Sequence, residues 1–200
     1  MCVYLLHITS YLTAFILLFS EKQNMEAFIS LNFITNNQLE DWMKSLKLPS
    51  VKWASMSSIH LTLSLIKLEK PDQDQMKNEI EEALRNIRKP VTIPFERLSL
   101  FGEENLVMLV QKEYRSGIWE MKRSIEKAIT NVELKQEDIF SPHITISRKF
   151  QLSSEIDKQK MSLLMLAKYS LDLQVKSVEV RILKRCLQAD TNPVVVTVDL

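Results

Sequence analysis

The order of apolar and polar positions predicts a chain in which strands and helices are interspersed. Runs of β-branched and aromatic residues predict strands, and apolar residues three and four positions apart predict amphipathic helices. The expected strands span residues 27–34, 59–68, 91–101, 106–111, 143–146, 170–175, 177–184 and 194–198. The expected helices span residues 39–46, 71–89, 118–132 and 156–168. Because a helix follows each of the strands 59–68 and 143–146, we predict an α+β fold of two similar halves.

These two strands carry the same four-residue pattern. Residues 60–63 read His-Leu-Thr-Leu, and residues 143–146 read His-Ile-Thr-Ile. Side chains of an extended strand alternate between two faces, so each histidine shares a face with its threonine and the aliphatic residues share the other. Each strand then buries one face and presents an imidazole and a hydroxyl on the opposite face. Two such strands predict one cleft with two walls.

The pattern favours acid–base chemistry on a phosphodiester. A pair of histidines holds one neutral and one protonated ring near pH 7, which supplies a base and an acid. Hydroxyls of Thr62 and Thr145 can donate to an anionic oxygen between the rings. One histidine would take a proton from a ribose hydroxyl or water, and the other would deliver one to the leaving oxygen. We therefore predict His60 and His143 as catalytic residues and the two threonines as substrate-binding residues.

Other readings of the motifs carry less weight. A single His-x-Thr in a strand is weak, because a lone histidine is more often structural, but two copies in matching settings favour a shared site. A third match, at His7, lies in an apolar leader and is treated as chance. Metal binding is less favoured, because no acidic residue accompanies either motif as a third ligand. We expect neither a metal nor a cofactor.

The composition of the chain excludes several classes of protein. A net charge of +1 with charges of both signs demands neither nucleic acid nor an anionic membrane as partner, so any anion must be held locally. Two glycines exclude a glycine-rich phosphate loop, and with it a conventional nucleotide-dependent kinase or dehydrogenase. Cys2 and Cys186 provide no disulfide framework, which fits a reducing compartment. We predict a cytoplasmic monomer.

The first 20 residues stand apart from this pattern. They carry no Asp, Glu, Lys or Arg, and residues 3–19 are mostly apolar. The stretch lacks the basic flank and small-residue cleavage site of a signal peptide, so a membrane tether, a packed extra helix and a dispensable extension all stay open. We assign residues 1–24 to an N-terminal extension or anchor and residues 25–200 to the globular domain. Membrane association is expected only through residues 3–19.

The two motifs resemble the pair of His-x-Thr/Ser-x motifs that defines the 2H phosphoesterase superfamily, also called LigT-like or 2′,5′ RNA ligase-like. The resemblance covers about Met25 to Cys186 and is supported by Pro142 before the second motif, whereas Ser57-Ser58-Ile59 precede the first motif where many members have proline. It implies a bilobal fold with a central cleft and metal-independent chemistry by the two histidines. The order of elements is most similar to the phosphoesterase-like domain of A-kinase anchoring proteins and to viral 2′,5′-phosphodiesterases.

Residues beyond the two motifs are less determined by the pattern. Arg148 follows the second motif and is expected to neutralise phosphate, although strict alternation places it on the aliphatic face unless the strand twists or ends there. A surface cation is the ordinary alternative. A site without a basic groove would hold a nucleobase by stacking it on aromatic side chains. For each aromatic residue, packing in the core is the alternative. The candidates are Trp53, Phe101, Tyr114 and Phe150.

The expected function is a metal-independent phosphodiesterase. Its substrates and partners would be 2′,5′-linked oligonucleotides, or nucleoside and RNA 2′,3′-cyclic phosphates, as the family resemblance implies. The alternative is a non-catalytic module of the same fold that binds RNA ends, nucleotides or another protein. Loss of either histidine would have favoured that alternative, and neither is lost.

Overall fold

The computed structural model describes residues 25–34, 37–69, 72–85, 87, 91–102, 104–135, 139–152, 154–183 and 192–200. The predicted extension or anchor, residues 1–24, lies outside this range, so its assignment stays a prediction. Among the described residues, no helix is both long enough and apolar enough to cross a membrane.

The described residues form one antiparallel sheet and four α-helices, which confirms the α+β class. The strands are β1 (Met25–Phe33), β2 (His60–Leu68), β3 (Thr92–Phe101), β4 (Asn105–Val110), β5 (Val132–Leu134), β6 (His143–Ser147), β7 (Leu171–Ile182) and β8 (Val194–Asp199). The helices are α2 (Asn37–Ser45), α3 (Gln73–Leu84), α4 (Arg115–Ala128) and α5 (Glu155–Leu166), with short 3₁₀ turns η1 (Met56–Ser58) and η2 (Lys112–Tyr114).

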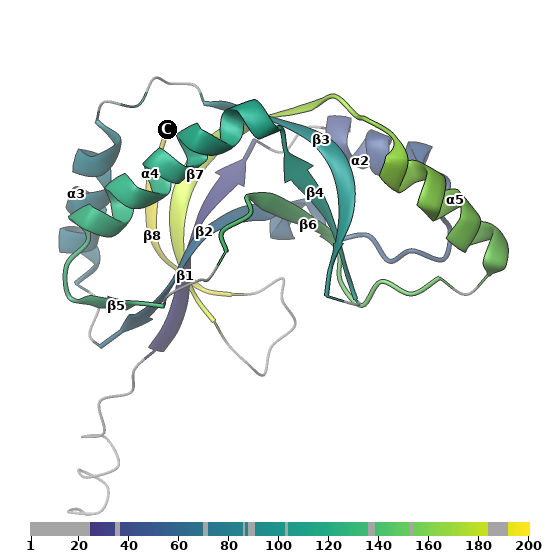
Figure 1. Cartoon of the computed structure of the whole chain (residues 1–200). Coiled ribbons are helices and arrows are strands. Elements are labelled where there is room, and N and C mark those ends of the chain that lie inside the picture. Colours follow the sequence, from purple (N-terminus) through teal and green to yellow (C-terminus); the bar gives the residue numbers. More distant parts are fainter. Residues whose placement is uncertain are drawn as a thin grey trace, which may run out of the picture.

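The sheet has two halves that share a strand. The strand order is β1-β2-β6-β4-β3-β7-β8, with β5 paired to β2 and β7 paired also to β1 (Figure 1). Residues 171–174 of β7 pair with β3, and residues 175–182 pair with β1. The first half therefore contains β5, β2, β1, β7 and β8, and the second contains β6, β4, β3 and the start of β7. This arrangement confirms the two-halved fold that the sequence predicts.

Each half carries a pair of helices. Helices α3 and α4 pack together and contact β8 and β2, whereas α5 contacts β3 (Figure 1). The chain just after α2 is tied to α5, because Lys160 Nζ donates to the Lys47 carbonyl over 2.7 Å and Ser50 Oγ donates to Asp157 over 2.9 Å. Two of the helices are capped at their N-terminal ends by a nearby side chain. The Asp72 carboxylate caps the first turn of α3, and the Ser154 hydroxyl caps α5.

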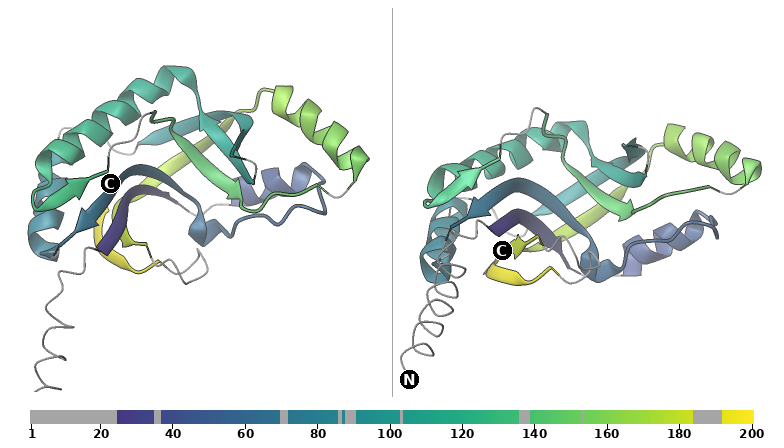
Figure 2. Two further views of the ribbon diagram at one scale, coloured as in Figure 1. Left: turned by 60° about the horizontal axis from the view of Figure 1, so that its bottom comes forward. Right: turned by 90° about the horizontal axis from the view of Figure 1, so that it is seen from below.

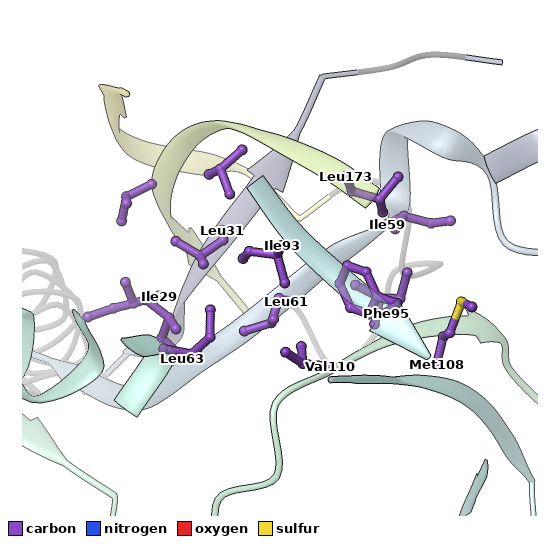
Figure 3. Packing of buried hydrophobic residues seen from close by; sticks show 14 of the residues in the cluster. Ile29, Leu31, Ile59, Leu61, Leu63, Ile93, Phe95, Met108, Val110 and Leu173 are labelled. Carbon is purple, nitrogen blue, oxygen red and sulfur yellow. The ribbon is translucent and has the colours of Figure 1, made fainter. Parts of the chain in front are cut away.

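The aliphatic faces of the strands form the core (Figure 3). Leu61, Leu63, Ile144 and Ile146, the aliphatic residues of the two motifs, are all 0% exposed. Burying each such side chain contributes roughly 1.5–3 kcal/mol, which fixes which face of β2 and β6 points inward. The histidines and threonines consequently occupy the opposite face, as the alternation predicts.

Several predicted elements have other bounds in the structure, and the predicted helix 71–89 is α3, which ends at Leu84. The predicted helix 118–132 ends at Ala128, and Val132 begins strand β5, which pairs with Leu68 of β2. The helical spacing of apolar residues continues past the end of α4, because Ile129 is buried although its backbone is already extended. The predicted strands 170–175 and 177–184 are one strand, β7. A register shift beside β1 leaves Lys176 unpaired, and this bulge interrupts the alternation that suggested two strands.

Candidate functional site

The two motif strands meet at one backbone pairing, between Leu61 of β2 and Ile144 of β6. In an antiparallel pair with this register, His60 falls across from Thr145, and His143 falls across from Thr62. All four side chains are partly exposed, in contrast to the buried residues between them. The structure therefore brings the four predicted residues together on one face of the sheet.

Both motifs end in the same irregularity. The register between β1 and β2 shifts so that Leu63 is left over between Thr62 and Ser64. The register between β4 and β6 shifts in the same way between Thr145 and Ser147. Such β-bulges bend a strand and increase its twist, and Figure 2 shows the arch of β2. The residue after each bulge is a buried serine, so the inward and outward faces change places at that point.

The two histidines are held by equivalent contacts. His60 Nδ1 lies 2.8 Å from the carbonyl oxygen of Ser58, and His143 Nδ1 lies 2.7 Å from the carbonyl oxygen of Ser141. A carbonyl can only accept, so Nδ1 carries the hydrogen and donates in both rings. The neutral ring then has an acceptor at Nε2. The same backbone contact thus sets both rings in one tautomer. Nε2 has no partner in the described part of the chain, so it can exchange protons with a ligand.

An aromatic ring lies against each histidine. The ring of Phe28 stacks on His60 with centroids 5.0 Å apart, and the ring of Phe101 is tilted against His143 at 4.3 Å. These contacts restrict the orientation of both imidazoles and remove water from one side of each. Phe101 was a sequence candidate for base stacking, and the structure places it at the site. Phe28 was missed, since its apolar strand gave no sign that it faces the histidine.

The other three aromatic candidates are placed differently. Phe150 is 8% exposed and belongs to the core. Trp53 forms a backbone bridge with Ser147, at the end of the second motif strand. Tyr114 precedes α4 and lines a mostly apolar cavity of about 450 Å³ between α3, α4 and the start of β3. None of these three has a ring contact with either histidine among the described residues.

Burial keeps both rings neutral in the ligand-free protein. Loss of water around the imidazole is the main reason that the pKa of His60 falls to about 4, against the opposing hydrogen bond to Ser58. The charges of Arg148, Arg181 and His143 lower the pKa of His60 further. Burial also lowers the pKa of His143 from its usual value near 6.5. An anionic ligand between the rings would act in the opposite direction on both.

The bulge in β6 resolves the orientation of Arg148. Strict alternation from His143 would place this residue on the aliphatic face, but Ser147 already occupies the core side after the bulge. Arg148 is exposed, and its charge acts on His60, which lies on the motif face. Within the described residues no hydrogen bond or ion pair engages its guanidinium. Its role in phosphate binding stays a proposal.

Residues 36–185 match the family model of the 2′-5′ RNA ligase superfamily, and both motifs lie inside the match. The chain belongs to this superfamily. The match confirms the family that the two motifs indicate.

This superfamily member is similar in sequence to one characterised relative and in fold to several solved structures, all at low sequence identity. The RNA 2′,3′-cyclic phosphodiesterase of Methanocaldococcus jannaschii is 21% identical over 145 residues, which cover 68% of this chain and 82% of that protein. The structure of E. coli LigT complexed with 3′-AMP is similar with a TM-score of 0.55 and 14% identity, over 88% of this chain and 96% of LigT. The MHV ns2 PDE domain has a TM-score of 0.51 and 15% identity, over 79% of this chain and 99% of that domain.

The sequence patterns considered above did not identify every residue at the site of this superfamily member. Each motif has a serine two positions before the histidine and another after the second aliphatic residue, so Ser-x-His-x-Thr-x-Ser is the full repeat. That longer repeat could have signalled both the carbonyl contacts and the bulges. Asn32 and Arg181, on the face shared with His60, gave no such signal, because strand register is not visible in the sequence. No group of three His, Cys, Asp or Glu side chains suited to a metal occurs in the described part of the chain.

Proposed function

We propose that the protein is a metal-independent phosphodiesterase acting on 2′,5′-linked oligonucleotides or on nucleoside and RNA 2′,3′-cyclic phosphates. The observation that carries the proposal is the pair of histidines on one face, each with Nδ1 on a backbone carbonyl and with no partner for Nε2 among the described residues. The 2′,3′-cyclic phosphodiesterase activity of the archaeal relative and the 3′-AMP complex of LigT support a nucleotide phosphodiester as substrate.

The two histidines take opposite roles in this proposal. His60 is the general base, because burial and the neighbouring positive charges hold its ring neutral. Its Nε2 accepts the proton of a ribose hydroxyl or of water. His143 is the general acid, and the bound phosphate raises its pKa so that Nε2 carries a proton. That proton passes to the leaving oxygen as its bond to phosphorus breaks.

Three further side chains hold the phosphate. The hydroxyls of Thr62 and Thr145 donate to its non-bridging oxygens from the two motif strands. Arg148 adds a positive charge beside them, which offsets the charge that builds up on the phosphorus oxygens in the transition state. This division of labour needs no metal ion, since both proton transfers and charge stabilisation come from the chain.

The test is incubation of the purified protein with 2′,5′-oligoadenylate, its 3′,5′ isomer and nucleoside 2′,3′-cyclic phosphates in the presence of EDTA. We expect cleavage of a 2′,5′ linkage or of a cyclic phosphate, and no turnover by the variant His60→Ala/His143→Ala. Equal cleavage by wild type and variant would reveal a contaminating enzyme. Binding of these ligands without turnover would instead support the alternative, a nucleotide-binding module.

A further inference from the structure

A polar surface continues from His60 across the neighbouring strands. Backbone register aligns His60 with Asn32 on β1, and Asn32 with Ser177 on β7. The next row aligns Thr62 with Ser30, and Ser30 with Glu179. Ser30 and Ser177 are 0% exposed and Asn32 is 7% exposed, so these polar groups are covered by their neighbours. The motif face of the first half is therefore polar well beyond its histidine.

Arg181 is the centre of this surface. Its Nε donates to Glu179 Oε2 at 2.8 Å, and its Nη2 donates to Asn32 Oδ1 at 3.2 Å. Nη2 also lies 2.6 Å from Glu179 Oε2, as an ion pair. Ser177 Oγ donates to the other oxygen of Glu179 at 3.2 Å. The side chains of Arg181 and Glu179 are only 15% and 14% exposed. A planar guanidinium fixed by two hydrogen bonds and an ion pair has little freedom left to rotate.

Among the described residues, the strand directly beside His143 does not carry the polar side chains that lie beside His60. Register aligns His143 with Leu109 on β4 and Thr145 with Val107, and neither aliphatic side chain can hydrogen-bond. The two half-sites are thus alike in their histidines and threonines but differ in the residue beside each. The strand directly beside His60 therefore offers hydrogen-bonding side chains, whereas the strand directly beside His143 offers aliphatic ones, and Arg97 and Ser99 of the second half lie one strand further away.

The charge of the network points to a neutral ligand group. Glu179 cancels the charge of Arg181, so the pair attracts a phosphate far less than Arg148 does, which no carboxylate engages among the described residues. The two N–H groups of Arg181 Nη1 have no partner among the interactions of the described residues. Guanidinium groups donate but never accept, so these two N–H groups suit an oxygen acceptor such as a sugar hydroxyl.

We propose that Arg181 donates through Nη1 to the ribose hydroxyl that neighbours the phosphate-bearing carbon, and that Glu179 and Asn32 are its positioning residues. The inference rests on the proposed function, which places the phosphate between the two histidines. It makes the first half the side that selects a ribonucleotide over its deoxy analogue. A site built to hydrogen-bond a hydroxyl discriminates strongly against a ligand that lacks it, because its own donors are then left unpaired.

Product-like ligands test this without involving the chemical step. Calorimetry would compare the affinities of adenosine 2′-phosphate and 3′-deoxyadenosine 2′-phosphate. Substrates are less suitable, because removing a hydroxyl from a substrate could also remove the nucleophile of the reaction. We expect the wild type to bind the hydroxyl-bearing ligand about 10-fold more tightly. The double variant Glu179→Gln/Arg181→Met removes both charges together, so that no buried charge stays unpaired, and should bind the two ligands within about 2-fold of each other.

Two further variants separate positioning from general effects. Glu179→Gln keeps the shape of the carboxylate but loosens Arg181, so we expect it to reduce the hydroxyl preference while Arg181 is still present. Arg97→Met is the matched control, because Arg97 aligns with Leu109 on the opposite half and should retain the full preference. Thermal unfolding of each variant reports whether the fold is intact.

Several outcomes would overturn the inference. Equal affinity of the wild type for the two ligands would exclude a hydroxyl contact, even if cyclic phosphates were hydrolysed normally. Equal weakening of both ligands in the double variant would make Arg181 a phosphate contact. A preserved hydroxyl preference in a protein that cleaves none of the substrates would instead contradict the proposed function and leave the binding site standing.

Discussion

Leu61 pairs with Ile144 where β2 meets β6, and both side chains are fully buried. This contact lies one residue away from each histidine along the two strands. The spacing of the two imidazoles is therefore set by the packing of two aliphatic side chains on the opposite face of the sheet. Core and site are coupled at this point, because a shift of either strand would move its histidine.

Truncating this contact should damage stability and activity together. Leu61→Ala and Ile144→Ala each leave a cavity in a closely packed core, which costs about 2–5 kcal/mol of unfolding free energy. Urea titration measures that loss. Because the two residues touch, we expect the double variant to lose less than the sum of the single losses. Strict additivity would show that the strands are positioned by other contacts.

Removing either histidine should abolish most of the activity and little of the stability. His60→Ala and His143→Ala each delete an acid or a base, which costs about 10² to 10⁴-fold in kcat. Steady-state kinetics on the best substrate, alongside circular dichroism, would measure both effects. Near-normal turnover by a folded variant would rule out the two-histidine mechanism.

The threonine hydroxyls should contribute to turnover and hardly at all to folding. Thr62→Val and Thr145→Val keep the shape of the side chain and remove the donor. We expect each to lower kcat/KM by about 10-fold or more while the melting temperature changes by only a few degrees. Ser64→Ala, which alters a buried hydroxyl on the core side, serves as a comparison. A variant that unfolds without a specific kinetic defect would make that threonine structural.

The pH dependence of kcat/KM should be bell-shaped with its maximum on the acidic side of 6.5. In the proposed mechanism the rate rises with pH as His60, the general base, loses its proton, around the pKa of about 4. It falls again as the acid His143 loses its proton, at a pKa that burial also lowers. EDTA should leave the curve unchanged. An activity that vanished with EDTA and returned with a divalent ion would indicate a metal-bound hydroxide instead.

The buried histidines should also make the fold less stable in mild acid. The pKa of His60 is lower in the folded protein than in the unfolded chain, so between about pH 6.5 and 4 the unfolded chain binds more protons. Its contribution is complete above pH 6.5 and is lost as the pH falls towards 4, by about 1–3 kcal/mol. Urea unfolding of wild type and His60→Gln at pH 7 and pH 4.5 would show a smaller loss for the variant. An identical loss would mean that His60 titrates normally.

Alternation of side chains was enough to predict the inner and outer faces of both motifs. Leu61, Leu63, Ile144 and Ile146 proved buried, because aliphatic residues at every second position of a strand leave only one stable orientation. The family and the two-halved α+β fold followed from the same pattern. These features are local in the chain, which is why the sequence displays them.

The features that were missed depend on contacts between distant residues. Alternation alone could not orient Arg148, because it does not show the bulge that forms where β6 pairs with β4. Val132 was predicted to be helical because its spacing continued the apolar stripe of α4. In the structure it pairs instead with Leu68 at the edge of β2 and is part of a strand. Asn32 and Arg181 are far apart in the chain, and only the register between β1 and β7 brings them together.

The shared strand β7 also limits how the enzyme can move. Because the continuous backbone of β7 is hydrogen-bonded to β1 in one half and to β3 in the other, the two halves cannot move apart as domains on a flexible linker do. Bending is easiest at the bulge, where Lys176 is left unpaired with β1 and its carbonyl instead accepts a hydrogen bond from Leu200 at 2.9 Å. The angle between the two histidine-bearing halves thus depends on Lys176 as well as on the pairing of Leu61 with Ile144, and a proline or glycine at residue 176 would change how rigidly the two rings face each other.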